Sequence, residues 1–404
     1  MAEKGSTRIL DGNNAAAQAA KLSRVQVIAA YPITPQSPVT EKLSEFVEKG
    51  ELDAQYIAVE SEHSALAVCT SASIVGARTF TASSSHGLAY MHEMLHWTAG
   101  ARLPVVLACV NRAIGAPWNV LNDQQDSVSQ RDTGWIQIYA RNNQEILDSI
   151  IQAYKIAESV HVPVMVCYDG FVLSHTEMPV NVPSQEDVDR FLPPYRPHTV
   201  LDPANPRNYN LVTFANPRAN AEGVLCHGYM ELRYLLQEAL QNSKETIIKV
   251  GQEFGEVFGR SYSNTLWANR LDDADTVIVA MGSLAMEATV AADTLREAGH
   301  KMGVLGLRVF RPFPKADVAK ALEKSRLIVV FDKNISYGLE GATCSEIKSA
   351  LYGSSVRPVV RNFIVGLGGR DIKARELVEA VNRSLLSVRE GDLTREYPEW
   401  ICAI

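Results

Sequence analysis

Two glutamates and a histidine, Glu60, Glu62 and His63, stand close together directly after a short apolar run at residues 56–59. Carboxylates beside an imidazole at the end of a strand can take up and release protons, which makes this segment a candidate acid–base site. The competing interpretation is that both glutamates only stabilise the positive N-terminus of the helix that begins there. Taken alone, the residues favour this second interpretation.

A proline-framed turn, Tyr31-Pro32-Ile33-Thr34-Pro35, follows another short apolar run. Each proline fixes its own backbone and forces the residue before it out of the helical conformation. Such a rigid turn can present its carbonyl groups and the Thr34 hydroxyl to a ligand. It can equally be a stiff connection in which Thr34 only caps the next helix, and the sequence leaves both alternatives open.

A third candidate, Arg112, stands where the β-rich run at residues 104–110 ends, and the polar loop 122–127 follows it. A guanidinium suits a carboxylate or phosphate because its planar fork offers two parallel hydrogen bonds. A surface ion pair with Asp123 or Asp126 would explain the same arginine without any ligand. The sequence does not decide between the two.

Three further signals are weak. The glycine-rich stretch 366–369 lacks both the lysine and the spacing of a phosphate-binding loop. His92 and His96 stand four apart on a predicted helix, but no HExxH motif surrounds them, so packing or surface positions are favoured over a metal site. The Gly282-Ser283 turn could bind an anion, although a tight turn is the commoner explanation.

The elements that would position these residues alternate between strand and helix. In the first half, the strand-like runs are residues 25–30, 56–59, 78–82, 104–110 and 162–168. Alternation at this spacing predicts an α/β fold whose parallel sheet is covered by helices on both faces. Ligands bind such sheets at the carboxyl ends of the strands, which is where the three candidate segments are expected to lie.

The alternation stops near residue 191 and restarts near residue 272, so we expect two doubly wound parallel-sheet domains. The predicted division is a first domain at 1–195, a linker with a long helix (229–258) at 196–258, a smaller second domain at 259–385 and a tail at 386–404.

Composition narrows the class of protein. The 404 residues carry a net charge of −7, which argues against a nucleic-acid partner or an anionic membrane surface. Neither a membrane-spanning run nor a signal peptide is visible, so a cytoplasmic location is expected. The six cysteines form no CxxC pair, so we expect no metal site in this chain and predict that each is a small buried side chain.

Several collinear segments resemble the alpha subunit of the pyruvate:ferredoxin oxidoreductase family, which comprises 2-oxoacid:acceptor oxidoreductases. They are AAYPITPQSP (29–38), ELDAQYIAVESEHSA (51–65), GARTFTASSSHGL (76–88), MHEMLHWTAGARLPVV (91–106), VNRAIGAPWNV (110–120), DSVSQRDTGWIQIYARNNQE (126–145), RVFRPFP (308–314) and NFIVGLGGRD (362–371). The stretch that begins VIVAMGSLAMEA also resembles the C-terminal domain of transketolase-like enzymes. Together the segments cover nearly the whole chain.

The resemblance implies a thiamine-diphosphate enzyme that is split over several subunits. The first domain would bind the aminopyrimidine, and the second would be the transketolase C-terminal-like domain. No GDG magnesium motif occurs in the first domain, so thiamine diphosphate is expected to be shared with a beta-type subunit that holds its diphosphate and Mg2+. A gamma-type subunit and a ferredoxin-like subunit with [4Fe-4S] clusters would complete the complex.

The same resemblance implies roles for individual residues. Glu62 corresponds to the catalytic glutamate that hydrogen-bonds the ring nitrogen N1′ of the aminopyrimidine. Thr34 and Arg112 correspond to residues that hold the substrate carboxylate, and Thr34 also lies beside the cofactor. Pro32 and Ile33 would line the pyrimidine pocket.

One departure concerns the substrate. The family often has glutamine where this chain has His86, so His86 either borders the substrate and indicates an acid other than pyruvate, or only packs locally. The expected reaction is the oxidative decarboxylation of a 2-oxoacid with coenzyme A to acyl-CoA and CO2. Pyruvate is the default substrate, followed by branched-chain and aryl 2-oxoacids. The alternatives are a transketolase-like or 2-oxoacid dehydrogenase subunit and a non-catalytic scaffold subunit.

Overall fold

The first half of the chain folds around a seven-stranded sheet in the computed structural model, which describes residues 5–197, 228–354 and 357–402. Six of its strands are parallel: β2 (Val27–Ala30), β3 (Gln55–Ala58), β4 (Thr79–Ser83), β5 (Val106–Asn111), β6 (Ile136–Tyr139) and β7 (Val164–Asp169). Their spatial order is β6-β7-β5-β4-β2-β3. The carboxyl ends of β5, β4, β2 and β3 therefore meet along one edge.

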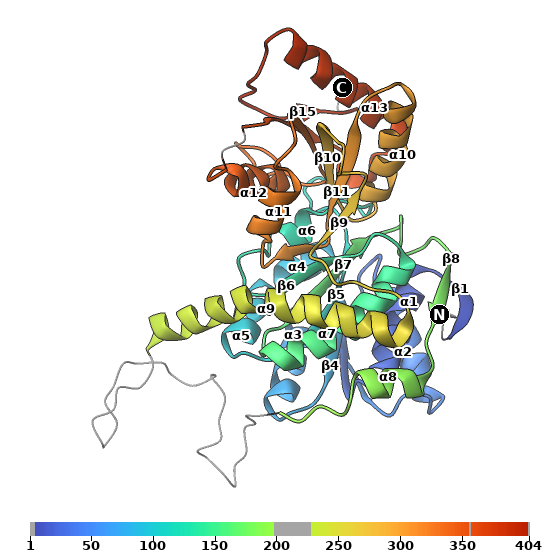
Figure 1. Ribbon diagram of the computed structural model, residues 1–404. Coiled ribbons are helices and arrows are strands. Elements are labelled where there is room, and N and C mark those ends of the chain that lie inside the picture. The colour runs from blue at the N-terminus through green and yellow to red at the C-terminus, as the bar shows by residue number, and fades with distance from the viewer. Residues whose placement is uncertain (1–4, 198–227, 355–356, 403–404) are drawn as a thin grey trace.

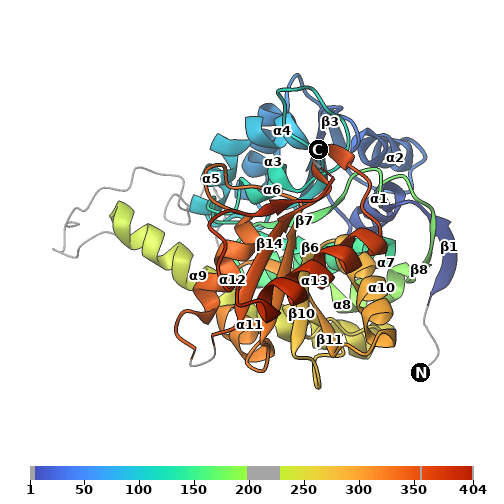
Figure 2. The same cartoon turned by 90° about the horizontal axis from the view of Figure 1, so that it is seen from above.

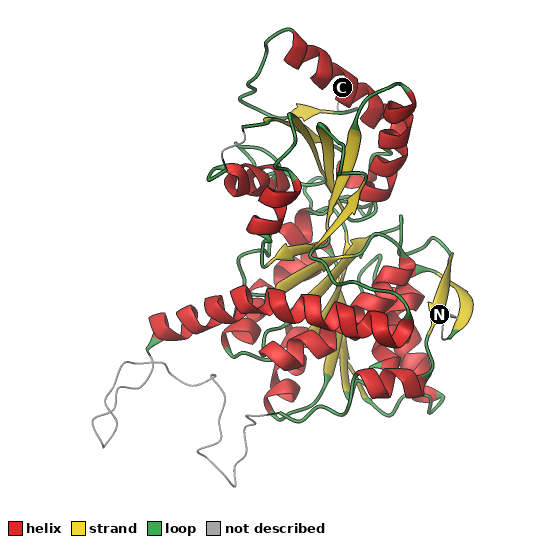
Figure 3. Ribbon diagram, viewed as in Figure 1, coloured by secondary structure: helices red, strands yellow, loops and turns green. Residues whose placement is uncertain are grey.

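Helices lie on both sides of this sheet, as Figure 3 shows by colour. They are α1 (Gly12–Leu22), α2 (Ser37–Glu48), α3 (Glu62–Ile74), α4 (Ser85–Tyr90), α5 (His92–Gly100), α6 (Gln125–Val128), α7 (Asn143–Val160) and α8 (Gln185–Phe191). The alanines of α1 let it approach closely, and α1 packs against α7 and α2. A sheet covered in this way has strands that are buried on both faces, which requires nearly continuous apolar runs.

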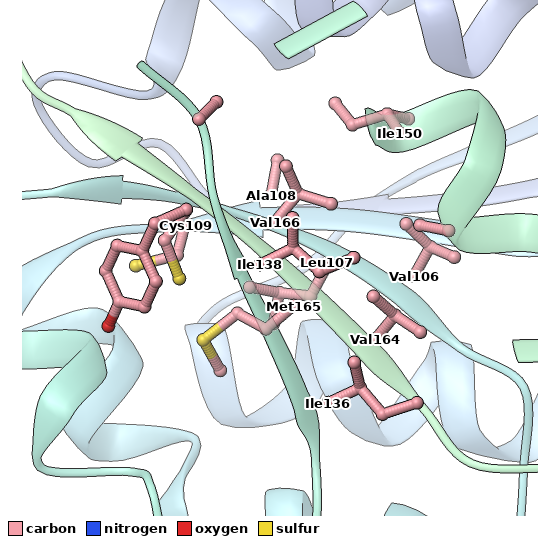
Figure 4. Packing of buried hydrophobic residues seen from close by; sticks show 14 of the residues in the cluster. Val106, Leu107, Ala108, Cys109, Ile136, Ile138, Ile150, Val164, Met165 and Val166 are labelled. Carbon is pink, nitrogen blue, oxygen red and sulfur yellow. The ribbon is translucent and has the colours of Figure 1, made fainter. Parts of the chain in front are cut away.

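Strand β5, with the sequence VLACVN, meets this requirement because all six of its residues are buried. Figure 4 shows its side chains beside those of the neighbouring strand β7: Val106 and Ala108 lie near Val164 and Val166, on the side of Ile150 in α7, whereas Leu107 lies near Met165. The strands at the centre of the sheet are therefore rigid, and they hold the turns at their carboxyl ends in fixed positions.

The second half of the chain builds a six-stranded sheet in the order β15-β14-β13-β10-β11-β9. The strands are β9 (Leu266–Asn269), β10 (Thr276–Met281), β11 (Met302–Leu307), β13 (Leu327–Asp332), β14 (Val359–Ile364) and β15 (Glu399–Trp400). All are parallel except β9, which runs antiparallel to β11.

Side chains alternate between the two faces of this second sheet. Ile278 and Val329 pack against α10 (Leu284–Glu297) and α13 (Ala374–Arg389), whereas Val279 and Val330 face α11 (Lys315–Ala321) and α12 (Ala342–Leu351). Figure 2 shows α10 and α13 together on one side and α11 and α12 on the other. This part is therefore doubly wound as well, and the predicted α/β fold class with two parallel-dominated sheets is confirmed.

The two halves are joined closely. Figure 1 shows the second sheet stacked on the first, with the long helix α9 (Tyr229–Phe258) running along the first part, where it packs against α7. A short strand of the second half, β12 (Val309–Arg311), extends the first sheet antiparallel to β6. One hydrophobic core contains buried residues of both sheets, so the two parts pack as one unit.

Outside the two main sheets, β1 (Ser6–Leu10) pairs with β8 (Met178–Val182) as a separate two-stranded ribbon. In the part of the chain that the structure describes, no helix combines the length and the apolarity needed to cross a bilayer.

Several sequence predictions can be compared with these elements. The long helix at 229–258 is confirmed, whereas the Pro- and Asn-rich linker that was expected before it lies almost entirely outside the described residues. Cys402 is exposed, so the prediction that every cysteine is buried is wrong for that residue. The domain limits at 195, 258 and 385 stay predictions, and α13 continues through the last of them.

Candidate active site

Four turns at the carboxyl edge of the first sheet bring the sequence-predicted site residues together. Thr34 follows β2, Glu62 follows β3, His86 follows β4 and Arg112 follows β5. Because these strands are neighbours in the order β5-β4-β2-β3, the turns form one continuous wall.

Arg112 is buried, with only 2% of its surface exposed. Its Nη1 donates to the carbonyl of Thr34 at 2.9 Å, and its Nε donates to the carbonyl of Asn119 at 3.1 Å. Its Nη2 is buried without a partner among the described residues. A buried donor that lacks a partner is costly unless a ligand satisfies it, so the guanidinium is arranged to receive an anion.

The alternative surface pair between Arg112 and Asp126 is wrong, because Asp126 is fully buried and bonds the backbone of Arg112 instead. Its carboxylate accepts from the backbone N–H groups of Arg112 and Ser85, each at 2.9 Å, and from the Asn111 side chain at 2.7 Å. Burial raises the pKa of Asp126 to about 7, against the lowering effect of these hydrogen bonds. Asp126 thus ties the end of β4 to the end of β5.

Asp123 makes no pair with the Arg112 guanidinium either. It is also buried, and it accepts from the backbone N–H groups of Gln125 at 3.0 Å and Gly368 at 3.2 Å. Burial raises the pKa of this carboxyl above its ordinary value. Both aspartates therefore organise the backbone around the arginine and leave its remaining donors available.

The ring of His86 occupies a defined position. The Gly115 N–H donates to Nε2 at 3.1 Å, so the proton of the neutral ring is assigned to Nδ1, which lies 3.1 Å from the Ser85 hydroxyl oxygen. The ring stacks on Trp118 with 5.8 Å between ring centroids and an interplanar angle of 9°. His86 therefore has local contacts on both nitrogens, which hold one face of the ring against the tryptophan.

Trp118 links His86 to Arg112, because the guanidinium carbon of Arg112 lies 4.9 Å from the indole ring centre. The indole itself is 77% exposed. An aromatic ring this exposed beside two polar side chains is typical of a surface that a ligand or another chain covers. The sequence contained Trp118 within a motif, but nothing in the sequence alone indicated that it joins the two site residues.

Glu62 is the first residue of α3 and is 8% exposed, whereas its neighbour Glu60 is exposed. Glu60 accepts a hydrogen bond from the Ser64 hydroxyl, which lowers the pKa of Glu60. The adjacent His63 lies 3.5 Å from Glu93. Of the three titratable groups in this segment, only Glu62 turns into the protein.

The Glu62 carboxylate lies directly over Gly87, since a Cβ on that glycine would be 2.5 Å from Oε1. The buried hydroxyl of Ser83 lies beside it, 2.6 Å from the same Cβ position, and has no partner among the described residues. A glycine that makes room for a carboxylate, next to an unsatisfied hydroxyl, leaves polar groups for a heteroaromatic ring to bind. These residues therefore fit an aminopyrimidine.

Two side chains fix the proline-framed turn by hydrogen bonds to its carbonyl groups. Gln36 Nε2 donates to the Tyr31 carbonyl at 2.8 Å, and the Asn13 side chain donates to the Pro35 carbonyl at 2.8 Å. Helix α2 has Gln36 as its N-cap and no side-chain cap, so Thr34 does not cap that helix. The turn instead leaves Pro32 and Thr34 exposed and Ile33 half-buried at the edge of the sheet.

The weak signals have structural explanations. The Gly282-Ser283 turn at the start of α10 already holds an anion of the protein itself, because Asp169 accepts from the Ser283 N–H at 2.8 Å. The stretch 366–369 contacts the loop after Arg112. His92 and His96 pack edge to face, with 4.9 Å between their ring centroids. Among the described residues, no group of three or more His, Cys, Asp or Glu side chains is placed to hold a metal ion.

Comparison with protein families gives two matches that are adjacent in the chain. Residues 18–251 match the family described as pyruvate flavodoxin/ferredoxin oxidoreductase, thiamine diphosphate-binding. Residues 274–377 match core domain II of pyruvate:ferredoxin oxidoreductase. Every candidate residue of the site lies within the first match.

Similar curated proteins carry two kinds of name. A ketoisovalerate oxidoreductase subunit VorA from Pyrococcus horikoshii is 49% identical over 394 residues, which is 97% of both chains. A pyruvate synthase subunit PorA from Methanocaldococcus jannaschii is 51% identical over 380 residues, which is 93% of this chain and 94% of that protein.

Two solved structures share the fold. A 2-oxoglutarate:ferredoxin oxidoreductase from Magnetococcus marinus superposes with a TM-score of 0.71 at 19% identity and covers 94% of this chain, which spans 66% of that longer one. A split-gene transketolase gives a TM-score of 0.53 at 13% identity and covers 96% of this chain and 99% of its own. Both likenesses concern the arrangement of the elements.

Proposed function

This chain belongs to the pyruvate flavodoxin/ferredoxin oxidoreductase family, and from that premise we propose how its residues serve the oxidative decarboxylation of a 2-oxoacid. The family is thiamine-diphosphate-binding, and the chain is a subunit of such an oxidoreductase. When bound, thiamine diphosphate supplies the carbon nucleophile and the electron sink that cleavage of the carboxylate requires. The protein supplies placement and proton transfer.

We assign Glu62 to the aminopyrimidine ring. Its carboxylate is buried over Gly87 beside the Ser83 hydroxyl, which has no partner among the described residues, so it can share a proton with a ring nitrogen. Pro32 and Ile33 would line the ring from the neighbouring turn. Glu60 is excluded from this role because it is exposed and bonded to Ser64.

We assign Arg112 and Thr34 to the carboxylate of the substrate. Nη2 of Arg112 has no partner among the described residues, and Nη1 donates to the backbone carbonyl of Thr34, whose side chain is exposed. A charge-assisted bond from the arginine contributes about 1.5–3 kcal/mol of binding free energy. The Nη2 of Arg112, which lacks a partner among the described residues, is the single observation that carries the proposed substrate site, because it leaves a buried donor at the carboxyl edge of the sheet.

For the substrate, pyruvate comes first and branched-chain 2-oxoacids second. The similar curated proteins are named for pyruvate and for ketoisovalerate. These names support a 2-oxoacid as the class of substrate and leave its side chain undetermined. The stacked rings of His86 and Trp118 stand next to Arg112. We propose that they border the substrate side chain and set the choice between the two acids.

We propose partner subunits in agreement with the sequence analysis. A beta-type subunit would hold the diphosphate and Mg2+, a gamma-type subunit would complete the core, and a ferredoxin-like subunit would carry [4Fe-4S] clusters. Large exposed apolar side chains support a protein interface: Trp118 and Leu121 in the segment after Arg112, and Tyr337 and Leu339 in the segment after β13. Helix α3, which begins with Glu62, is apolar around much of its circumference and has the exposed Ile57 and Val75 close by.

A panel of 2-oxoacids tests this function. The complex, purified without oxygen, is assayed for coenzyme A-dependent reduction of an electron-acceptor dye with pyruvate, 2-oxoisovalerate and an aryl 2-oxoacid. We expect turnover of at least one of them and co-purification of a cysteine-rich ferredoxin-like chain. Co-purification of a lipoyl-bearing chain, without dye reduction, would favour the dehydrogenase alternative.

A further inference from the structure

The second sheet holds the loop that supports Arg112. This loop, residues 119–125, belongs to the first half of the chain, yet it makes hydrogen bonds with residues at or after the carboxyl ends of three strands of the second sheet, β13, β10 and β14. The Gln124 N–H donates to the Lys333 carbonyl at 2.8 Å, and the Ile335 N–H donates to the Gln125 side chain at 2.9 Å. The Gln124 side chain donates to the Met281 carbonyl at 3.2 Å.

The third of these contacts is with the glycine-rich stretch after β14, which includes a short 3-10 helix (Leu367–Gly369). The Asn119 side chain donates to the Gly368 carbonyl at 3.0 Å, while the Gly368 N–H donates to Asp123 at 3.2 Å. The Gly369 N–H donates to the Asn122 carbonyl at 2.6 Å. The loop is thus bonded through both its backbone and its side chains.

Glycine is required at residue 368 for two physical reasons. Its φ is +60°, a conformation that residues with a Cβ avoid. A Cβ there would also lie 2.5 Å from Nδ2 of Asn119, the atom that makes the bond to its carbonyl. The stretch that lacks the features of a phosphate-binding loop is therefore shaped to receive Asn119.

Asn119 connects Gly368 to Arg112, because it forms hydrogen bonds with both residues. Its carbonyl accepts from Arg112 Nε at 3.1 Å, and its Oδ1 accepts from the Leu121 N–H at 2.7 Å, which fixes the turn. Arg112 in turn bonds Thr34. A continuous series of hydrogen bonds therefore runs from Gly368 through Asn119 to Arg112 and Thr34.

We propose that Asn119 and Gly368 are positioning residues for substrate capture, through which the second sheet sets the orientation of the Arg112 guanidinium. The inference rests on the proposed role of Arg112 in holding the substrate carboxylate. It gives the second half of the chain a part in the reaction, although none of its residues was predicted to touch substrate. Coupling of this kind through a packed network changes rates by about 3- to 30-fold per substitution.

The test uses the assembled complex and four variants. Gly368→Ala and Asn119→Asp break the contact, the first by crowding Nδ2 and the second by turning a donor into an acceptor that faces a carbonyl. Asn119→Ala is a milder break. Gly366→Ala is the matched control, because Gly366 has a similar φ of +64° in the same turn but its Cβ would meet Lys333 at 3.2 Å and not the 119–125 loop.

We expect each contact variant to lower kcat/KM for the 2-oxoacid by about 3- to 30-fold, mainly through KM, with KM for coenzyme A unchanged. In an Arg112→Ala background the same substitutions should cause no further loss, because their effect passes through the arginine. Losses that multiply in that background, or equal effects of Gly366→Ala and Gly368→Ala, overturn the inference. A normal kcat/KM for Arg112→Ala overturns the proposed substrate site itself, and the inference with it.

Discussion

Arg112 and Thr34 are 78 residues apart in the chain and are joined by a hydrogen bond of 2.9 Å from the guanidinium to the threonine carbonyl. The bond connects the turn after β5 to the turn after β2, across the carboxyl end of β4. It uses one terminal nitrogen of the arginine and leaves the other without a partner in the part of the chain that the structure describes. The two turns are therefore held at a fixed separation, with a donor available between them.

Arg112→Ala should lower kcat/KM for the 2-oxoacid by roughly 10- to 150-fold, because a charge-assisted bond of about 1.5–3 kcal/mol is lost. Lysine should rescue only part of this, since it lacks the planar fork. Steady-state kinetics of the complex provide the measurement. Arg141→Ala is the control, because its guanidinium also lies over an indole, that of Trp267, at 4.3 Å. A change within about twofold for Arg112→Ala would remove the substrate role.

Asp126 should give the complex a distinctive pH dependence. Its pKa in the folded protein is about 7, above the ordinary 3.8, so between these values the folded protein holds a proton that the unfolded chain has released. The contribution of this group to the free energy of unfolding therefore falls as pH rises through that window. Asp126→Asn should flatten this dependence and destabilise the protein by about 1–3 kcal/mol, because an amide nitrogen would face N–H donors.

Thermal unfolding of the complex between about pH 4.5 and pH 8 checks this slope. Asp371→Asn serves as the control, because that carboxylate is exposed. If wild type and Asp126→Asn change in parallel with pH, the carboxyl of Asp126 does not titrate in that range.

His86→Gln should change the preference between pyruvate and 2-oxoisovalerate more than it changes stability. Glutamine can still accept from Gly115 and reach Ser85, but the stacking on Trp118 is lost. A reshaped apolar contact typically changes discrimination by about 10-fold or more. His175→Gln is a close control, since His175 bonds Ser174 and stacks on Phe171 in the same way elsewhere. An unchanged ratio of the two kcat/KM values would leave His86 as a packing residue.

Much of the fold could be predicted because it depends on local patterns. Helix α9 begins and ends at the residues that the sequence predicted, 229 and 258. Strand β12 was missed, since three residues are too few to show a period and its Val309 pairs with Ile138, which lies 171 positions earlier. The sequence of residues 87–99 predicts a single helix, but the structure interrupts it at Met91, between α4 and α5.

The candidate site was predicted only in part, for a physical reason. Strand ends and unusual residue types indicated Glu62, Thr34 and Arg112, and the topology brings their turns together. The sequence could not distinguish a surface aspartate from Asp126, because both appear as acidic residues in a polar loop. The burial and hydrogen-bond partners of Asp126 and Arg112 depend on contacts with Ser85 and Asn119, which only the assembled fold provides.

Turnover of the complex that carries Glu62→Gln tests the central claim most directly. The amide keeps the shape of the side chain over Gly87 but cannot share a proton with the ring nitrogen, so we expect assembly to be preserved and activity to fall by about 10²- to 10⁴-fold. Glu60→Gln is the matched control and should stay near wild type, because that carboxylate is exposed and bonded to Ser64. Near-normal decarboxylation by Glu62→Gln, or a loss confined to Glu60→Gln, would contradict the account.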